Sequence, residues 1–273
     1  MLKKHHIGAL LGAAAMTAML AAPANAVPVT EWDYAVTAAF SSATSTFDGP
    51  GNGPGFTETP GLISWGDPGG TLTPDGGRSG LGIGNSPAIG SVMTDGAAEL
   101  ANNFTHFNNV VSLSFPTLES ATIDVMISLT PSVPATPGNV PLDMMFQVNF
   151  LETPNNGSGG TCADGTPVGA NGPGCRDIFA IELGDLEFPF EFDDNFYNLT
   201  FSELTGILAP LGGAPCAAVG LAADCIGFMT EEEADTTAQF QLAIESVEVP
   251  APGVVGLLGL GVMSLALRRR RTA

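Results

Sequence analysis

The sequence predicts an all-β fold, an antiparallel β-sandwich or jelly-roll-like single domain. Three observations predict it. Several segments alternate apolar and polar residues with a period of two, which is typical of half-buried strands. Helical periodicity is almost absent. The chain also contains 35 glycines and 21 prolines, which suit many short strands joined by turns.

The N-terminus has the parts of a secretory signal peptide. Lys3 and Lys4 precede an apolar stretch over residues 7–22, which ends in Ala24-Asn25-Ala26. We expect a signal peptidase to remove residues 1–26. The exported domain is then expected over residues 27–249.

The strands of this domain are predicted from the alternation. Four segments alternate clearly: 122–129, 144–150, 186–192 and 239–245. Weaker strands are expected over 30–37, 110–115, 177–183 and 196–201. Pro189 lacks a backbone N–H, so its strand is expected at a sheet edge or a bulge. Two stretches rich in glycine and proline, 49–90 and 155–174, are predicted as long loops, and 231–238 as the one plausible helix.

The exported part is strongly acidic. The whole chain has 8 Lys and Arg against 28 Asp and Glu, but only Arg78 and Arg176 lie between residues 27 and 249. Two basic side chains against 28 acidic ones leave a formal charge of −26. Such a charge repels nucleic acid and excludes it as a partner. It fits either a solubility role or the binding of divalent cations.

The four cysteines predict disulfides. Proximity in the sequence favours the pairs Cys162–Cys175 and Cys216–Cys225 among the three pairings that four cysteines allow. A zinc site is the alternative, but neither spacing is Cys-x₂₋₄-Cys and the single histidine of residues 27–249 is distant in sequence.

That histidine is His106. It is a candidate general base, metal ligand or hydrogen-bonded structural residue. No motif such as Gly-x-Ser-x-Gly supplies an activated nucleophile beside it. We therefore predict no catalytic residue and do not expect an enzyme, a secreted hydrolase being the last alternative.

Two further sets of residues are candidates for binding. Asp193 and Asp194 are weak candidates for a Ca²⁺ site, and a solvated acidic sheet edge is the alternative. Trp32, Trp65 and Tyr34 would stack on sugars if exposed, although the protein core is the usual place for tryptophan. No resident cofactor is expected, and Ca²⁺ is the candidate cation.

The C-terminus reads as a sorting signal. Pro250-Ala251-Pro252 is followed by an apolar run over residues 253–267 and then by Arg268, Arg269, Arg270 and Arg271. The run would be about 22 Å long as a helix, against a bilayer core of ~30 Å. The arginines would keep this end cytoplasmic and the folded part outside. We expect a removable transmembrane sorting helix over residues 250–273, with a permanent single-span anchor as the alternative.

This tail resembles that of the PEP-CTERM proteins, although alanine replaces the central glutamate of their Pro-Glu-Pro signature. Thr105-His106-Phe107-Asn108 is similar to the Thr-His-x-Asn signature of one subgroup. So are Glu31-Trp32 and the segments 62–66, 149–155 and 175–179. The resemblance implies processing by an exosortase-type protease after transient anchoring in the inner membrane. It also implies a final place on the outer cell surface or in the extracellular matrix.

We therefore expect an exported surface or matrix protein with a binding or structural role and an unassigned activity. Extracellular polysaccharide is an expected partner, and a calcium- or carbohydrate-binding module is the alternative. The resemblance assigns no role to Thr105, His106 and Asn108.

Overall fold

The computed structural model describes residues 27–41, 45–48, 55–112, 114–155, 160–182, 186–222 and 225–248. Both predicted targeting segments, 1–26 and 250–273, lie outside these ranges. Within the described ranges, no helix is long and apolar enough to cross a membrane.

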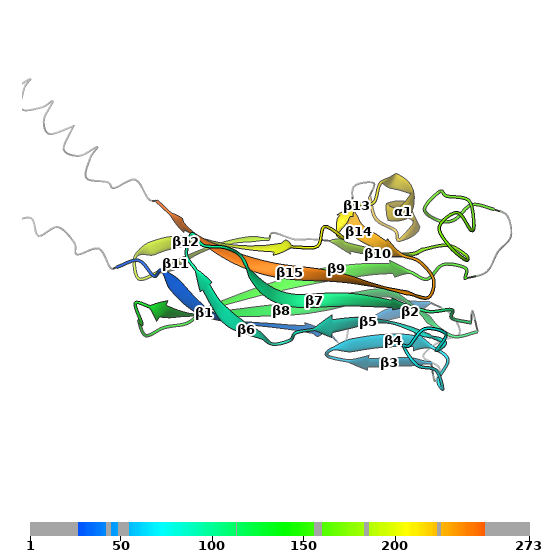
Figure 1. Cartoon of the computed structure of the whole chain (residues 1–273), viewed down its shortest axis with the longest axis horizontal. Helices are drawn as coiled ribbons and strands as arrows, with labels where there is room; N and C mark the ends of the chain where they lie inside the picture. The colour runs from blue at the N-terminus through cyan, green and yellow to red at the C-terminus, as the bar shows by residue number, and fades with distance from the viewer. Residues whose placement is uncertain are drawn as a thin grey trace, which may run out of the picture.

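The described residues form two antiparallel β-sheets that pack face to face as a sandwich (Figure 1). The first sheet has the order β13-β14-β10-β9-β8-β1-β6, with β2 paired to β8. Its strands are β1 (Glu31–Phe40), β2 (Thr46–Asp48), β6 (Ala88–Met93), β8 (Thr117–Val133), β9 (Val140–Leu151), β10 (Asp177–Glu182), β13 (Ala209–Pro210) and β14 (Ile226–Thr230).

The second sheet has the order β11-β12-β15-β7-β5-β4-β3. Its strands are β3 (Phe56–Thr59), β4 (Leu62–Gly66), β5 (Arg78–Gly84), β7 (Glu99–Asn108), β11 (Glu187–Phe192), β12 (Asn195–Glu203) and β15 (Ala234–Val247). One short helix, α1 (Gly213–Ala218), lies beside β13 and β14 (Figure 1).

The core lies between the two sheets and follows the predicted alternation. Along β8, Ile123, Val125 and Ile127 are buried, while Asp124 and Met126 between them are exposed. The expected strands at 144–150, 186–192 and 239–245 are confirmed as parts of β9, β11 and β15. Those at 30–37 and 196–201 are confirmed as β1 and β12, and the one at 177–183 is confirmed in its described residues as β10. Strand β11, which holds Pro189, is an edge strand of its sheet, as predicted.

The predicted loop over residues 49–90 is wrong, because it contains β3, β4, β5 and the start of β6. Strand β5 was not predicted because its glycines have no side chains and so give no alternation of apolar and polar residues. A Cβ on Gly82 would lie 3.0 Å from the Phe107 ring, and one on Gly80 would lie 2.9 Å from the Ile63 carbonyl oxygen. Strand β5 is glycine-rich because neighbouring groups fill the space that its side chains would need.

The expectations for 110–115 and 231–238 are also wrong. After β7 ends at Asn108, the described residues between it and β8 form no strand. There Asn109 bonds to the loop before β5 and to β5 itself, because its Nδ2 donates to the carbonyl oxygens of Leu72 and Arg78 at 3.3 and 2.7 Å. Residues 231–233 form a tight turn in which Glu233 has a φ of 59°, and β15 follows at once. The helix α1 was not predicted, because its sequence shows no helical periodicity.

The two ends of the described chain lie at the same end of the sandwich (Figure 1). The Val29 N–H donates to the Tyr197 hydroxyl at 2.8 Å, and the Val29 carbonyl accepts from Thr94 Oγ1 at 2.7 Å. The next residue, Asp95, accepts from the backbone N–H and the hydroxyl of Ser246. The start of β1 and the end of β15 are therefore joined through the β6–β7 connection.

Candidate functional site

The Thr-His-x-Asn segment lies at the end of β7, where the pleat separates its members. Thr105 points to the outer surface and its hydroxyl bonds to that of Thr237 at 2.9 Å. His106 and Asn108 point into the sandwich and are 0 and 1% exposed. The motif is therefore a pair of interior side chains and one surface residue.

His106 lies in an aromatic and acidic environment. Its ring stacks on Trp65 of β4, with centroids 6.3 Å apart, and meets Phe150 of β9 edge-on at 5.0 Å. Its Nε2 is 3.8 Å from Oδ2 of Asp177, too long for a hydrogen bond, and neither ring nitrogen has a hydrogen-bond partner. Burial lowers the pKa of His106 to about 3, so the imidazole is neutral near pH 7.

Asp177 begins β10 on the opposite sheet and is 0% exposed. Its Oδ1 accepts hydrogen bonds from the backbone N–H and the hydroxyl of Thr153 at 2.7 and 3.1 Å. Its Oδ2 faces His106. Burial raises the pKa of Asp177 to about 7, although the Thr153 hydrogen bonds act in the opposite direction. This carboxyl is therefore partly protonated at neutral pH.

Glu152 follows β9 directly and is the second carboxyl of the cluster. Its Oε2 accepts a hydrogen bond of 2.7 Å from the Trp65 indole N–H. Burial, and then the neighbouring Asp177 carboxylate, raise the pKa of Glu152 well above its ordinary value. A proton on Glu152 also bonds the two carboxyls to each other, which stabilises the ionised form of Asp177.

Glu232 is the third carboxyl and lies in the turn between β14 and β15. It is 6% exposed, and neither of its carboxylate oxygens has a hydrogen-bond partner. Burial, and then the Asp177 charge, raise its pKa to about 8. We call His106, Glu152, Asp177 and Glu232 the buried acid cluster.

Side-chain amides and hydroxyls around the buried acid cluster hold the neighbouring loops. The Asn108 amide donates to the carbonyl oxygens of Thr230 and Glu231, both at 3.1 Å. The Thr153 hydroxyl donates to the carbonyl of Cys175 at 2.9 Å. Asn155 likewise donates to the Val111 carbonyl at 2.6 Å. The cluster thus connects both sheets to the β14–β15 turn and to the loop that ends at Cys175.

That loop is closed by a disulfide. Cys162 bonds to Cys175 and Cys216 bonds to Cys225, as proximity predicted, and the described part of the chain has no free cysteine. The zinc alternative for these cysteines is therefore wrong. The expected loop at 155–174 is confirmed in its described residues, which form no strand or helix.

The candidate calcium residues occupy a turn. Asp193 and Asp194 form the tip of the β11–β12 hairpin with φ values of 50° and 59°. In the described ranges, no three His, Cys, Asp or Glu side chains have the arrangement of a metal site. The structure thus gives a backbone reason for both aspartates, since aspartate tolerates positive φ.

The aromatic candidates for sugar stacking are interior residues. Trp32 and Trp65 are 0% exposed and Tyr34 is 6% exposed. Trp32 packs edge-on against Phe190, at a centroid distance of 5.5 Å. The default placement in the core is confirmed, so these three side chains present no sugar-binding platform.

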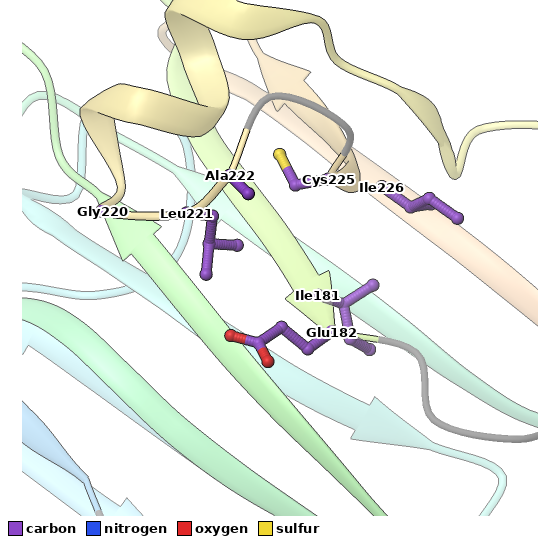
Figure 2. A pocket seen from close by; sticks show the side chains of 7 residues that line it. All are labelled: Ile181, Glu182, Gly220, Leu221, Ala222, Cys225 and Ile226. Atoms are coloured by element: carbon purple, nitrogen blue, oxygen red, sulfur yellow. The ribbon is translucent and has the colours of Figure 1, made fainter.

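An open hollow of about 480 Å³ lies elsewhere, where the loop after α1 passes the ends of β10 and β14 (Figure 2). Among the described residues of its lining, Glu182 is the charged one, and its carboxylate extends beside Leu221 (Figure 2). No member of the buried acid cluster lines it. Its remaining lining residues are Ile181, Gly220, Ala222, Cys225 and Ile226.

The sequence singled out His106 and missed its three acidic neighbours. Glu152, Asp177 and Trp65 nevertheless lie in segments that carry the family resemblance: 149–155, 175–179 and 62–66. Those segments and the Thr-His-x-Asn motif come from four strands of two sheets and meet at the buried acid cluster. The meeting of these segments could have identified the site. It can be seen only once the order of the strands in the two sheets is known.

The cluster's chemistry is that of a closed interior. A catalytic base must touch its substrate, whereas His106 and Asp177 are both fully enclosed. The arrangement can hold and share protons among its carboxyls, and it can position the loops bonded around it. A search against models of protein families finds no match to this chain, and a search of curated proteins finds none either.

Proposed function

We propose that this chain is an exported protein of the cell surface or extracellular matrix, sorted through its PEP-CTERM-like tail, with a binding or structural role. The observation that carries the proposal is the order of signals in the sequence. A signal peptide precedes an acidic body, and Pro250-Ala251-Pro252, an apolar run and Arg268–Arg271 follow it.

Two structural features support this proposal. Both disulfides suit an oxidising compartment, where such bonds persist. Val29 and Ser246 lie at one end of the sandwich. A tether attached after β15 would therefore present the opposite end, with α1 and the Cys162–Cys175 loop, away from the membrane.

We also propose that the sandwich is of the jelly-roll-like kind. The chain passes repeatedly between the two sheets, from β2 to β3, from β5 to β6, from β6 to β7 and from β7 to β8. Such crossing connections distinguish wound sandwiches from simple stacked meanders. This architecture would supply a rigid spacer whose loops are free to carry binding.

The first experiment is the intact mass of the protein recovered from the envelope and medium of its native host. We expect a chain that starts at Val27, ends near Pro250, and is lighter by about four hydrogens for two disulfides. A chain that retains Ala273 would show a permanent anchor and refute removal of the tail. Recovery from the cytoplasm with residues 1–26 attached would refute export.

A matched pair of variants tests the tail itself. Replacing Arg268–Arg271 by glutamine removes the charge but keeps the length, and we expect the unprocessed form to accumulate. Replacing the exposed Glu187 and Glu191 by glutamine changes the charge of the body alone and should leave processing unchanged. Equal processing of both variants would contradict a sorting role for the arginine cluster.

A further inference from the structure

The buried acid cluster contains three carboxyls without a fixed cation. Arg78 and Arg176 are the two basic side chains of the described region that keep their charge near pH 7, and both are engaged elsewhere. Arg176 pairs with Asp164 at 2.8 Å, and Arg78 donates to Ser64 at 2.8 Å. Since an uncompensated charge in a protein interior is very costly, the cluster has to retain protons to stay closed.

Six of the 13 buried side-chain atoms without hydrogen-bond partners in the described residues belong to this cluster. They are both ring nitrogens of His106, one oxygen each of Glu152 and Asp177, and both oxygens of Glu232. An ionised carboxylate can only accept a hydrogen bond, whereas a protonated one can also donate. Protons on these carboxyls therefore supply the donors that the cluster otherwise lacks.

We propose that the buried acid cluster is a proton-dependent lock, which closes the β14–β15 turn and the Cys162–Cys175 loop while its carboxyls are protonated and releases them when the protons leave. Both segments are bonded to it directly. Glu232 is part of the turn, and Asp177 accepts two hydrogen bonds from Thr153, whose hydroxyl in turn bonds Cys175. Ionisation would place like charges on Glu152, Asp177 and Glu232 in a closed interior, and their repulsion would drive the turn and the loop apart although the Thr153 hydrogen bonds favour an ionised Asp177.

The other charged groups around the lock do not replace the protons. Glu231 and Glu233 on the same turn are exposed, and Glu233 shares a hydrogen bond with Asp75. On the loop side, Asp164 is neutralised by Arg176. Every remaining neighbour is therefore acidic, neutral or already paired.

The direction of the pH effect follows from the raised pKa values. Asp177 and Glu232 have pKa values of about 7 and about 8 in the folded protein, above their ordinary values of 3.8 and 4.5. Their stabilising contribution is complete at acidic pH and is lost as the pH rises through 7 and 8. The lock is therefore expected to open on the alkaline side of neutrality. This inference does not depend on how the protein is sorted.

The test is amide hydrogen exchange of the exported protein at pH 6 and pH 9, with each rate corrected for the intrinsic effect of pH. We expect residues 160–175 and 226–235 to lose at least about tenfold in protection at pH 9, because the opening equilibrium gains a factor of about ten for each pH unit between the ordinary pKa of a carboxyl in the open form and its raised pKa in the closed form. Amides of β1 and β8 should keep theirs. Equal protection of the two segments at both pH values, or a uniform loss over the domain, would overturn the proposal.

Two variants sharpen the result. Glu232→Gln removes one ionisable member and should reduce the loss at pH 9, while Glu231→Gln alters the exposed neighbour and should behave like the native protein. Addition of CaCl₂ or ZnCl₂ at pH 9 decides between protons and a cation. Restored protection in the native protein but not in Glu232→Gln would mean that a cation closes the cluster, and the proton lock would be wrong. If the variants do not fold, the native protein's pH and metal responses decide alone.

Discussion

Replacing His106 by leucine tests the charge state of the buried acid cluster. Leucine has nearly the same volume and can fill the space beside Trp65 and Phe150, although it has no ring to stack on them. The imidazole leaves two buried nitrogens without partners, at a cost of roughly 1–3 kcal/mol each. Leucine removes that cost but loses two aromatic contacts of about 0.5–1.5 kcal/mol each. We therefore expect His106→Leu to be more stable by about 2 kcal/mol at pH 7.

The opposite result follows if His106 and Asp177 form a charged pair. Their atoms are 3.8 Å apart, and breaking a buried ion pair costs about 3–5 kcal/mol. Charging His106 is disfavoured by a pKa drop from 6.5 to about 3, which corresponds to roughly 5 kcal/mol. The neutral form should therefore dominate, and His106→Leu should not carry the ion-pair penalty.

The assay is urea unfolding followed by tryptophan fluorescence. Phe104→Leu, on the same face of β7, measures the ordinary cost of changing a core ring on that strand. A loss above about 3 kcal/mol in His106→Leu, beyond that of the control, would refute the neutral imidazole. The direction in which stability changes with pH is a second check. The His106 contribution is present above pH 6.5 and lost as the pH falls toward 3, so the leucine variant should be less sensitive to acid.

Three further changes test the surrounding bonds. Asn108→Ala leaves two backbone carbonyls without their donor and should lower the free energy of unfolding in urea by about 2–4 kcal/mol. Thr105→Ala, on the outer face, should change it by no more than about 0.5 kcal/mol. Equal costs would contradict the inward placement of Asn108 and the outward placement of Thr105. Trp65→Phe keeps an aromatic ring but removes the indole N–H that donates to Glu152, so we expect a lower unfolding midpoint. An unchanged midpoint would argue against that bond. Joint replacement of Cys162 and Cys175 by serine should cost about 3 kcal/mol and expose the loop to proteases, and an unchanged cleavage pattern would count against a closing role for the disulfide.

The fold class was predictable because alternation reports directly which face of a strand is buried. The segment 122–129 alternates so regularly that its place in β8 follows from the pattern alone. Strand β5 was missed because glycine has no side chain to alternate. Its Gly80 and Gly82 are fitted to groups on β4 and β7, and those neighbours are known only from the sheet order.

The candidate site was half predictable for a similar reason. His106 could be selected as the single histidine of residues 27–249, but its role depends on Glu152 and Asp177, which lie on the other sheet. Each of these acids sits at a strand boundary, where a charged residue is ordinary. Their burial follows from the packing of the sheets and from the loop ending at Cys175, which local patterns do not reveal.

The position of β15 determines how the sandwich would carry mechanical load. This strand lies between β7 and β12 and ends beside the start of β1. A pull applied after Val247, along the strand and against the far end, would load its cross-strand hydrogen bonds side by side rather than one after another, since those bonds run perpendicular to the strand. Force at the tail would load the ladder to β12 over residues 240–247 together with the ladder to β7 over residues 234–242. The domain should therefore resist stretching along its length better than peeling from an edge such as β11.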